Sequence, residues 1–294
     1  MIAENFPESL PLIMFIATTP TTSINLEQAD QVLAKLFQAH RIAIISHRGP
    51  DPDTIGSNLA LYTFLNSLGK EVHSLCIDPL PYNSHFLPAI KNYLHNLIPE
   101  NYDLLISVDC GSTSQVGFDK VFPELFQKNF INIDHHASNN FFGTLNIVQT
   151  NLSSTCEIIY NLFHYWQVKI TPQIATYLLF GLYYDTGSFM HSNVTPEVLE
   201  MAENLLRFGA NQKSIISNLY HNFSEEKFHL WGNTLEKINL TSKNSAIAVI
   251  SNQELQAYTN ISDNLSGVID YISMTKESDF ASIVTEEKIG QIKG

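Results

Sequence analysis

The residues of this sequence that are best suited to chemistry follow its apolar segments. The run Ile42–Ile45 is followed closely by His47, Asp51 and Asp53, in a turn that contains a glycine and two prolines. Imidazole and carboxylate groups are good ligands for hard or borderline divalent cations. A solvated turn with an aspartate that caps the next helix would produce a similar local pattern. This segment by itself therefore leaves both interpretations open.

The pattern recurs at three later places in the chain, which favours the metal site. Asp109 follows the apolar run 104–108, and Asp134-His135-His136 follows the run 130–133. Asp185 ends a long apolar segment. Solvated turns usually carry Asn, Ser and Gly at such positions rather than His and Asp. The candidate metal ligands are His47, Asp51, Asp53, Asp109, His135 and Asp185, with Asp134 and His136 beside them.

Four carboxylates and two imidazoles are more donors than one cation needs. We therefore expect two divalent metal ions that share a carboxylate. A set of Asp and His without Cys favours Mn²⁺, with Mg²⁺ or Co²⁺ as alternatives and Fe²⁺ or Zn²⁺ as further substitutes. Two ions about 3.5–4 Å apart are a common arrangement for in-line displacement at phosphorus, in which they activate a water and hold phosphoryl oxygens.

Strands and helices must alternate to position these side chains. Over the first two hundred residues, apolar runs lie at 42–46, 72–77, 104–108, 130–133 and 143–148. They alternate with helical patterns at 26–40, at 59–69, at 153–166 with Ser153 as candidate cap, and at 172–184 and 196–209. The segment 78–100 has no clean period and is predicted to be loop with some helix. This alternation predicts an α/β fold with a mostly parallel sheet and helices on both faces. The carboxyl ends of parallel strands lie at one edge of the sheet, where ligands bind in such folds.

The pattern changes near residue 211. Two amphipathic helices, at 215–220 and 225–240, predict a helical linker, and a second αβ unit follows with strands at 246–250 and 280–284 and helices at 253–258 and 265–274. About fifty residues make a marginal domain, so we expect the smaller α/β C-terminal domain to be truncated. The predicted organisation is an N-terminal extension (1–24), a metal-binding catalytic domain (25–210), a linker (211–242) and a partial substrate-binding domain (243–294).

Composition narrows the functional classes. The 294 residues are 44% hydrophobic and 15% charged, with a formal net charge of −13. This charge argues against binding long duplex DNA, whereas bound cations would let the site accept an anion. Three cysteines without disulfide or zinc-ribbon spacing favour a cytoplasmic location. The apolar run 10–17 is too short to span a bilayer, so no membrane partner is expected.

The ordered motifs resemble those of the DHH phosphoesterase superfamily. They are His47-Arg48-Gly49-Pro50-Asp51-Pro52-Asp53, Val108-Asp109-Cys110-Gly111-Ser112, Asp134-His135-His136 and Asp185-Thr186-Gly187, and the variant Gly56-Ser57 resembles the first subfamily. That subfamily contains RecJ-type exonucleases, cyclic-dinucleotide phosphodiesterases, and oligoribonucleases that also remove the 3′-phosphate of 3′-phosphoadenosine 5′-phosphate. The chain length is most similar to the oligoribonuclease and nucleotide phosphatase branch.

The resemblance implies a role for each motif residue. His47 and Asp51 would hold one ion, Asp53, His135 and Asp185 the other, and Asp109 would bridge them. His136 would face the reacting phosphoryl group, and Asp134 would orient a histidine. The implied activity is Mn-dependent hydrolysis of short oligoribonucleotides and nucleotide 3′,5′-bisphosphates, with a DHH domain joined to a smaller DHHA1-like domain. The sequence leaves open whether the chain forms a homodimer.

One departure from the family pattern keeps two alternatives open. Family members usually have a glycine-rich, histidine-containing loop in the small domain, and no such loop follows Asn211 here. The chain would then be a fragment, or would have lost part of its grip on substrate, and its substrate-binding residues cannot be assigned. The alternatives are a cyclic or linear dinucleotide phosphodiesterase and a non-catalytic, metal-loaded nucleotide-binding protein.

Overall fold

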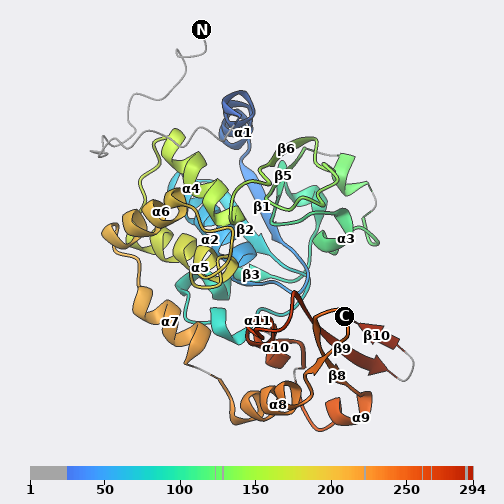
Figure 1. The fold of residues 1–294 in the computed structure, drawn as a ribbon. Helices are drawn as coiled ribbons and strands as arrows, with labels where there is room; N and C mark the ends of the chain where they lie inside the picture. Colours follow the sequence, from blue (N-terminus) through green and yellow to red (C-terminus); the bar gives the residue numbers. More distant parts are fainter. Residues whose placement is uncertain are drawn as a thin grey trace. The chain divides into compact units, whose positions relative to one another are not determined.

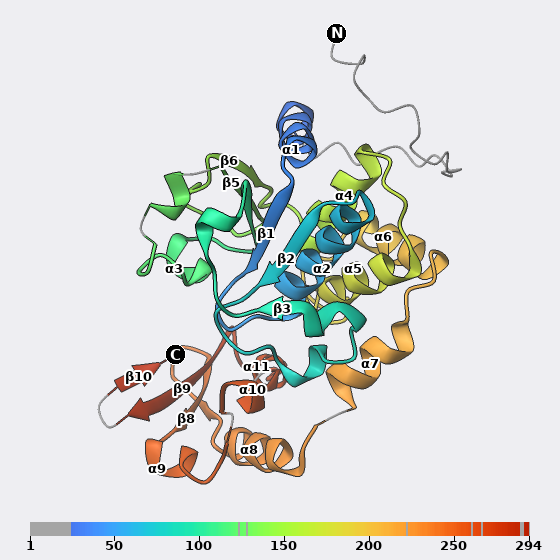
Figure 2. The same cartoon turned by 180° about the vertical axis from the view of Figure 1, so that it is seen from behind.

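The computed structural model describes residues 25–122, 124–127, 129–221, 223–259, 261–265, 267–288 and 291–293. The chain divides between Asn218 and Leu219 into two compact units, which Figures 1 and 2 show from opposite sides. The predicted N-terminal extension, residues 1–24, lies outside the described residues, as do residues 289, 290 and 294 of the predicted terminal strand and turn.

The first unit contains a six-stranded parallel sheet, which confirms the predicted fold class. Its strand order is β3-β2-β1-β4-β5-β6, and each neighbouring pair is parallel. The chain fills one half of the sheet from the centre outward and then returns to the centre to fill the other half. The reversal lies between β1 and β4, where ligands bind in doubly wound sheets. The strands are β1 (Arg41–Ser46), β2 (Glu71–Leu75), β3 (Tyr93–Leu94), β4 (Leu104–Val108), β5 (Phe130–Asp134) and β6 (Leu145–Val148).

Helices and loop segments cover both faces of this sheet. Figures 1 and 2 show α2, α4, α5 and α6 together on one side and α3 on the other. On the α3 side, Ala43 and Ile45 of β1 pack with Val116, Phe118 and other buried apolar residues. The helices are α1 (Leu26–Gln38), α2 (Pro52–Ser67), α3 (Thr113–Val116), α4 (Thr155–Tyr165), α5 (Pro172–Asp185), α6 (Pro196–Arg207) and α7 (Gln212–Tyr220), which reaches into the second unit.

Two glycines let α2 and α5 approach until their backbones touch. A Cβ on Gly56 of α2 would lie 2.4 Å from the carbonyl oxygen of Tyr177. A Cβ on Gly181 of α5 would lie 2.7 Å from a carboxylate oxygen of Asp53. Such distances exclude any larger residue unless the backbone moves. The contact matters for the site because α2 carries Asp53 and α5 ends in Asp185.

The second unit contains a four-stranded mixed sheet with the order β10-β9-β8-β7. The central pair, β8 and β9, is parallel, and both edge strands are antiparallel to their neighbours. Leu230, Ile250 and Leu255 form one buried cluster, and Ala246, Ala248 and Ile272 form another. The elements are α8 (Glu225–Glu236), β7 (Asn239–Leu240), β8 (Ser245–Ile250), α9 (Asn252–Leu255), α10 (Ile261–Leu265), α11 (Val268–Ser273), β9 (Phe280–Lys288) and β10 (Gln291–Lys293).

Three local predictions were wrong. The predicted helix 225–240 ends at Glu236, because residues 239–240 pair with β8 as an edge strand. The segment 78–100 contains β3 in addition to the expected loop and short helical turns, and two residues are too few to show strand periodicity. Ser154, and not Ser153, caps α4 by accepting a hydrogen bond from the backbone N–H of Glu157.

None of the helices described from Leu26 onward combines the length and the apolar character needed to cross a membrane.

Candidate metal centre at the switch point of the sheet

The first group of candidate ligands surrounds the junction of β1 and α2. His47 directly follows β1. Its Nδ1–H donates to the carbonyl of Arg48 at 2.8 Å, so Nε2 is the ring nitrogen that faces the other candidate ligands. Nε2 lies 3.6 Å from a carboxylate oxygen of Asp51. The same oxygen of Asp51 caps α2 by accepting from the backbone N–H groups of Asp53 and Thr54. Asp51 is therefore both a helix cap and a neighbour of His47.

Asp109 lies between two histidines. Ser46 of β1 pairs with Val108 of β4, so His47 and Asp109 leave adjacent strands at the same level. The backbone of Asp109 has a φ of 62°, a left-handed conformation that few residues other than glycine adopt and that often marks functional sites. Its Oδ2 lies 3.4 Å from Nε2 of His47, and its Oδ1 lies 3.6 Å from Nε2 of His135. Each carboxylate oxygen thus faces a different imidazole.

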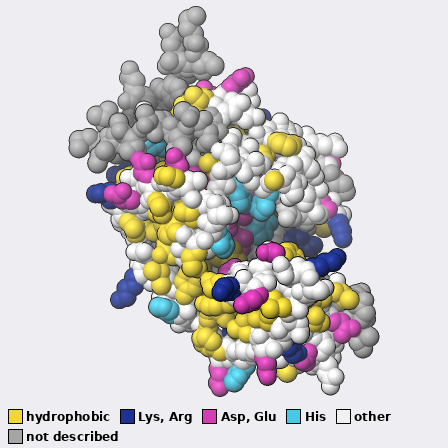
Figure 3. Space-filling view, in the orientation of Figure 1, with side chains coloured by type: hydrophobic (Ala, Val, Ile, Leu, Met, Phe, Trp, Pro, Cys, Tyr) yellow, Lys and Arg dark blue, Asp and Glu magenta, His cyan; other side chains and the backbone are white. Residues whose placement is uncertain are grey.

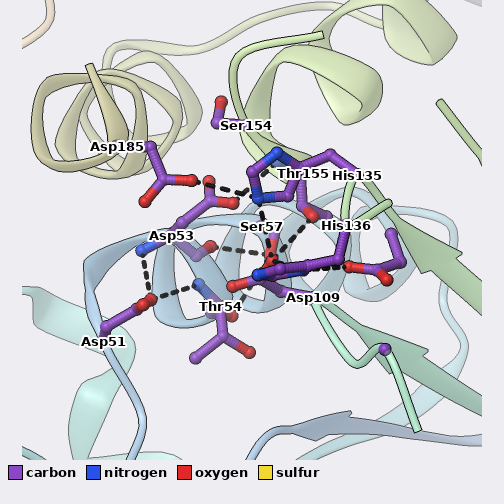
Figure 4. Close-up of polar contacts among 12 residues, drawn as sticks. Asp51, Asp53, Thr54, Ser57, Asp109, His135, His136, Ser154, Thr155 and Asp185 are labelled. Carbon is purple, nitrogen blue, oxygen red and sulfur yellow. Dashed lines mark hydrogen bonds and ion pairs between the residues drawn. The ribbon is translucent and has the colours of Figure 1, made fainter. Parts of the chain in front are cut away.

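The second group joins elements that are far apart in the sequence. Nε2 of His135, after β5, lies 3.2 Å from Oδ2 of Asp185 at the end of α5. Asp53 lies in the first turn of α2 and is fully buried. One potential ligand atom from each of Asp53, His135 and Asp185 lies within 4.8 Å of the others. The side chains converge as Figure 4 shows.

The structure thus brings all six predicted ligands together. Among the described residues, three groups have ligand atoms close enough to share a cation, and Asp109 belongs to two of them. Histidine side chains with acidic side chains beside them also gather on one face of the molecule in Figure 3. The three groups are His47, Asp51 and Asp109; Asp53, His135 and Asp185; and Asp109, His135 and His136.

His136 is oriented by Asp134 from behind the cluster. Its Nδ1 donates to Oδ1 of Asp134 at 2.7 Å, while 42% of the His136 side chain is exposed. Oδ2 of Asp134 accepts from Nδ2 of the buried Asn139 at 2.6 Å. Burial alone would raise the pKa of Asp134, but these two hydrogen bonds outweigh it and lower the pKa. The same hydrogen bond to Asp134 raises the pKa of His136, although burial opposes this shift.

The remaining charges are poorly compensated without a cation. Burial and then repulsion from Asp185 raise the pKa of Asp53 well above its usual value, and burial raises the pKa of Asp185 to about 6. Burial alone would lower the pKa values of the two histidines, yet the nearby carboxylates raise them to about 11 for His47 and about 10 for His135.

These shifts, and the donor set itself, fit a divalent cation. Such an ion would replace the protons on the imidazoles and relieve the repulsion between the carboxylates. In the ion pairs described for the clustered carboxylates, the partners are histidines, and no lysine or arginine takes part.

Two residues close to the cluster were not predicted from the sequence. Thr155 donates to Asp109, and Asn139 donates to Asp134. In the sequence, Thr155 lies near the start of the predicted helix 153–166, and Asn139 lies between the apolar runs 130–133 and 143–148. The contact of Thr155 joins two separate elements, and that of Asn139 closes a short turn. Hydrophobic periodicity indicates neither kind of contact.

The chain matches known proteins over the same region. Residues 41–182 match the DHH family, N-terminal domain. The chain is 32% identical over 242 residues to the bifunctional oligoribonuclease and PAP phosphatase NrnA of Thermus thermophilus, covering 81% of this chain and 71% of that protein. It is 26% identical to the Bacillus subtilis protein of the same name, covering 80% and 78%.

A solved structure has a similar fold. The crystal structure of an exopolyphosphatase-related protein from Bacteroides fragilis superposes with a TM-score of 0.83 at 24% identity, covering 92% of this chain and 83% of that one. Sequence and fold therefore agree. The first three motifs, at 47–53, 108–112 and 134–136, lie inside residues 41–182, and the fourth, at 185–187, lies just beyond them. The chain belongs to the DHH family of phosphoesterases.

Proposed function

We propose that this chain is a metal-dependent hydrolase that acts on short oligoribonucleotides and on nucleotide 3′,5′-bisphosphates. The observation that carries the proposal is the position of Asp109, whose two oxygens face His47 of one donor group and His135 of the other. The oligoribonuclease and PAP phosphatase of Thermus thermophilus supports this substrate class.

We assign the six predicted ligands to two cations, with Mn²⁺ favoured. His47 and Asp51 would hold one, Asp53, His135 and Asp185 the other, and Asp109 both. When bound, such ions neutralise phosphoryl oxygens and make water a stronger nucleophile. In this acidic chain they would also reverse the local field, so that an anionic phosphate can approach the buried carboxylates.

His136 is proposed to act on the leaving group. The hydrogen bond to Asp134 raises the pKa of His136, which favours the protonated form of the imidazole. Nδ1 is engaged with Asp134, so Nε2 is the nitrogen that would donate a proton to the departing oxygen or stabilise its charge. Asp134 and Asn139 hold the ring in place for this step.

We assign substrate binding to residues 243–294, with 211–242 as the linker. The three cysteines are buried free thiols, which supports a reducing, cytoplasmic location for the protein.

The test is hydrolysis by the metal-free chain with and without added Mn²⁺. The substrates are RNA oligomers of about two to five nucleotides, 3′-phosphoadenosine 5′-phosphate and a cyclic dinucleotide. We expect Mn²⁺-dependent release of mononucleotides and of 3′-phosphate. Preferential cleavage of the cyclic dinucleotide would replace the proposed substrate class. Nucleotide binding in calorimetry without any product would instead indicate a binding protein.

A further inference from the structure

The start of α4 contacts the carboxylate of Asp53 through its backbone. The N–H of Thr155 donates to Oδ2 of Asp53 at 2.7 Å, and the N–H of Cys156 donates to Oδ1 at 2.9 Å. These are donors of the first helical turn, which have no partner within the helix. Both oxygens of Asp53 are therefore oriented by a helix that supplies none of the predicted ligands.

The side chain of Thr155 makes a second contact of this kind. Its hydroxyl donates to Oδ1 of Asp109 at 3.0 Å, and both residues are buried. Thr155 thus contacts one carboxylate from each of two ligand groups, through its backbone in one case and its hydroxyl in the other. Figure 4 shows Thr155 in the same cluster as Asp53, Asp109 and His135.

The hydroxyl donates to the oxygen of Asp109 that faces His135. Oδ1, the oxygen that accepts from Thr155, is the one 3.6 Å from His135, and Oδ2 is 3.4 Å from His47. A carboxylate without this hydrogen bond could rotate about its terminal torsion, which has a broad energy profile. Rotation would disturb the contacts of Asp109 with His47 and with His135 at once.

The position of Thr155 is itself fixed by neighbouring contacts. The hydroxyl of Ser154 caps α4 by accepting from the N–H of Glu157 at 3.0 Å. The carboxylate of Glu157 in turn accepts from the N–H and the hydroxyl of Ser153, both at 2.7 Å. This reciprocal arrangement ties the first turn of α4 to the preceding loop, so Thr155 has little freedom to move away from Asp109.

We propose that Thr155 is a positioning residue that couples the two ligand groups by holding Asp109 and Asp53 in fixed orientation. The inference rests on the cation binding assigned above. Residues that hydrogen-bond to metal ligands typically change metal affinity about 10- to 100-fold when they are lost.

The experiment compares three variants of the full chain after metal removal. Thr155→Val keeps the shape and the backbone N–H but removes the hydroxyl, and Thr155→Ser restores the hydroxyl. Thr234→Val is the matched control, because Thr234 is also fully buried and its hydroxyl donates at 2.7 Å only to a carbonyl of its own helix, that of Leu230. Mn²⁺ affinity and stoichiometry are measured by calorimetry, the absorption spectrum with bound Co²⁺, and the melting temperature without metal.

We expect Thr155→Val to bind Mn²⁺ roughly 10- to 100-fold more weakly and to alter the Co²⁺ spectrum. Thr155→Ser and Thr234→Val should stay within about threefold of the unmodified chain. Equal Mn²⁺ affinity and an equal spectrum in Thr155→Val would overturn the inference, even if its melting temperature fell. The same holds if Thr155→Ser is as weak as Thr155→Val. Failure of the unmodified chain to bind Mn²⁺ would contradict the proposed function instead.

Discussion

The two units each place a parallel strand directly before a helix, yet the acidic residues near the two junctions have opposite electrostatics. At the junction of β8 and α9, Glu254 accepts from the backbone and hydroxyl of Ser251 in a capping box and pairs with Lys237. The ion pair with Lys237 and the hydrogen bonds lower the pKa of Glu254 to about 2. At the junction of β1 and α2, burial raises the pKa of Asp53 instead.

This difference shows what separates a structural acid from a candidate ligand. Glu254 has a cation beside it and solvent around it, so its charge is compensated within the fold. Asp53 is fully buried, 16% of the Asp185 side chain is exposed, and the two carboxylates lie close to each other. A carboxylate whose folded environment disfavours its charge needs a proton or an external cation, and such residues often mark functional sites.

The largest effect should come from replacing Asp109. Asp109→Asn keeps the size of the side chain but removes the charge shared by both ligand groups. We expect hydrolysis to fall roughly a thousandfold or more, because loss of cation stabilisation amounts to several kcal/mol. Glu254→Gln, the matching change in the second unit, should leave the rate within about twofold. A loss of activity in Glu254→Gln as large as that in Asp109→Asn would remove the distinction between the two junctions.

Replacing His136 should separate proton transfer from metal binding. His136→Ala removes the proposed proton donor, so we expect kcat to fall about 10²- to 10³-fold, within the usual range for general acids. Mn²⁺ affinity measured by calorimetry should stay within about threefold. His229→Ala serves as the control, since His229 is an exposed histidine of α8. A large loss of Mn²⁺ affinity in His136→Ala would make His136 a ligand.

Cation binding should release protons from the first unit. The raised pKa values of His47 and His135, about 11 and about 10, leave both imidazoles protonated in the metal-free chain at pH 7.5. Because a ligand must be deprotonated, Mn²⁺ should displace at least these two protons and bind more tightly as the pH rises. Calorimetry at one pH in two buffers of different ionisation enthalpy measures this number. Release of no protons would contradict the assignment of both histidines.

Neutralising an acidic residue should change the melting temperature of the metal-free chain in opposite directions at the two junctions. The pKa of Asp185 is raised to about 6 by burial, so its charge destabilises the fold fully above about pH 6 and not below about pH 4. Asp185→Asn should therefore raise the melting temperature at pH 8, with a gain that shrinks toward pH 4. The lowered pKa of Glu254 gives stability that is present above about pH 4.5 and lost toward pH 2, so Glu254→Gln should lower the melting temperature slightly at pH 8. Thermal unfolding at both pH values tests the two signs.

The sequence indicated the parallel sheet and the elements that bring the candidate ligands together, because buried parallel strands read as short apolar runs. Asp109, His135 and Asp185 could be selected for the same reason, since each directly follows such a run or a buried helix. The contact of Thr155 with Asp109 could not be predicted, because it joins the start of α4 to the residue that follows β4, far away in the sequence. The end of α8 was also missed, since pairing of Asn239 with β8 overrides the helical pattern.

The glycine contact between α2 and α5 has a consequence for the choice of cation. At Gly56 and Gly181 the two helices are already as close as backbone atoms allow. The separation between the ends that carry Asp53 and Asp185 therefore cannot shrink to suit an ion of smaller radius. Discrimination among Mg²⁺, Mn²⁺ and larger ions would then depend on rotation of the ligand side chains, because α2 and α5 cannot move closer together. Exchange of one ion for another would leave both helices in place.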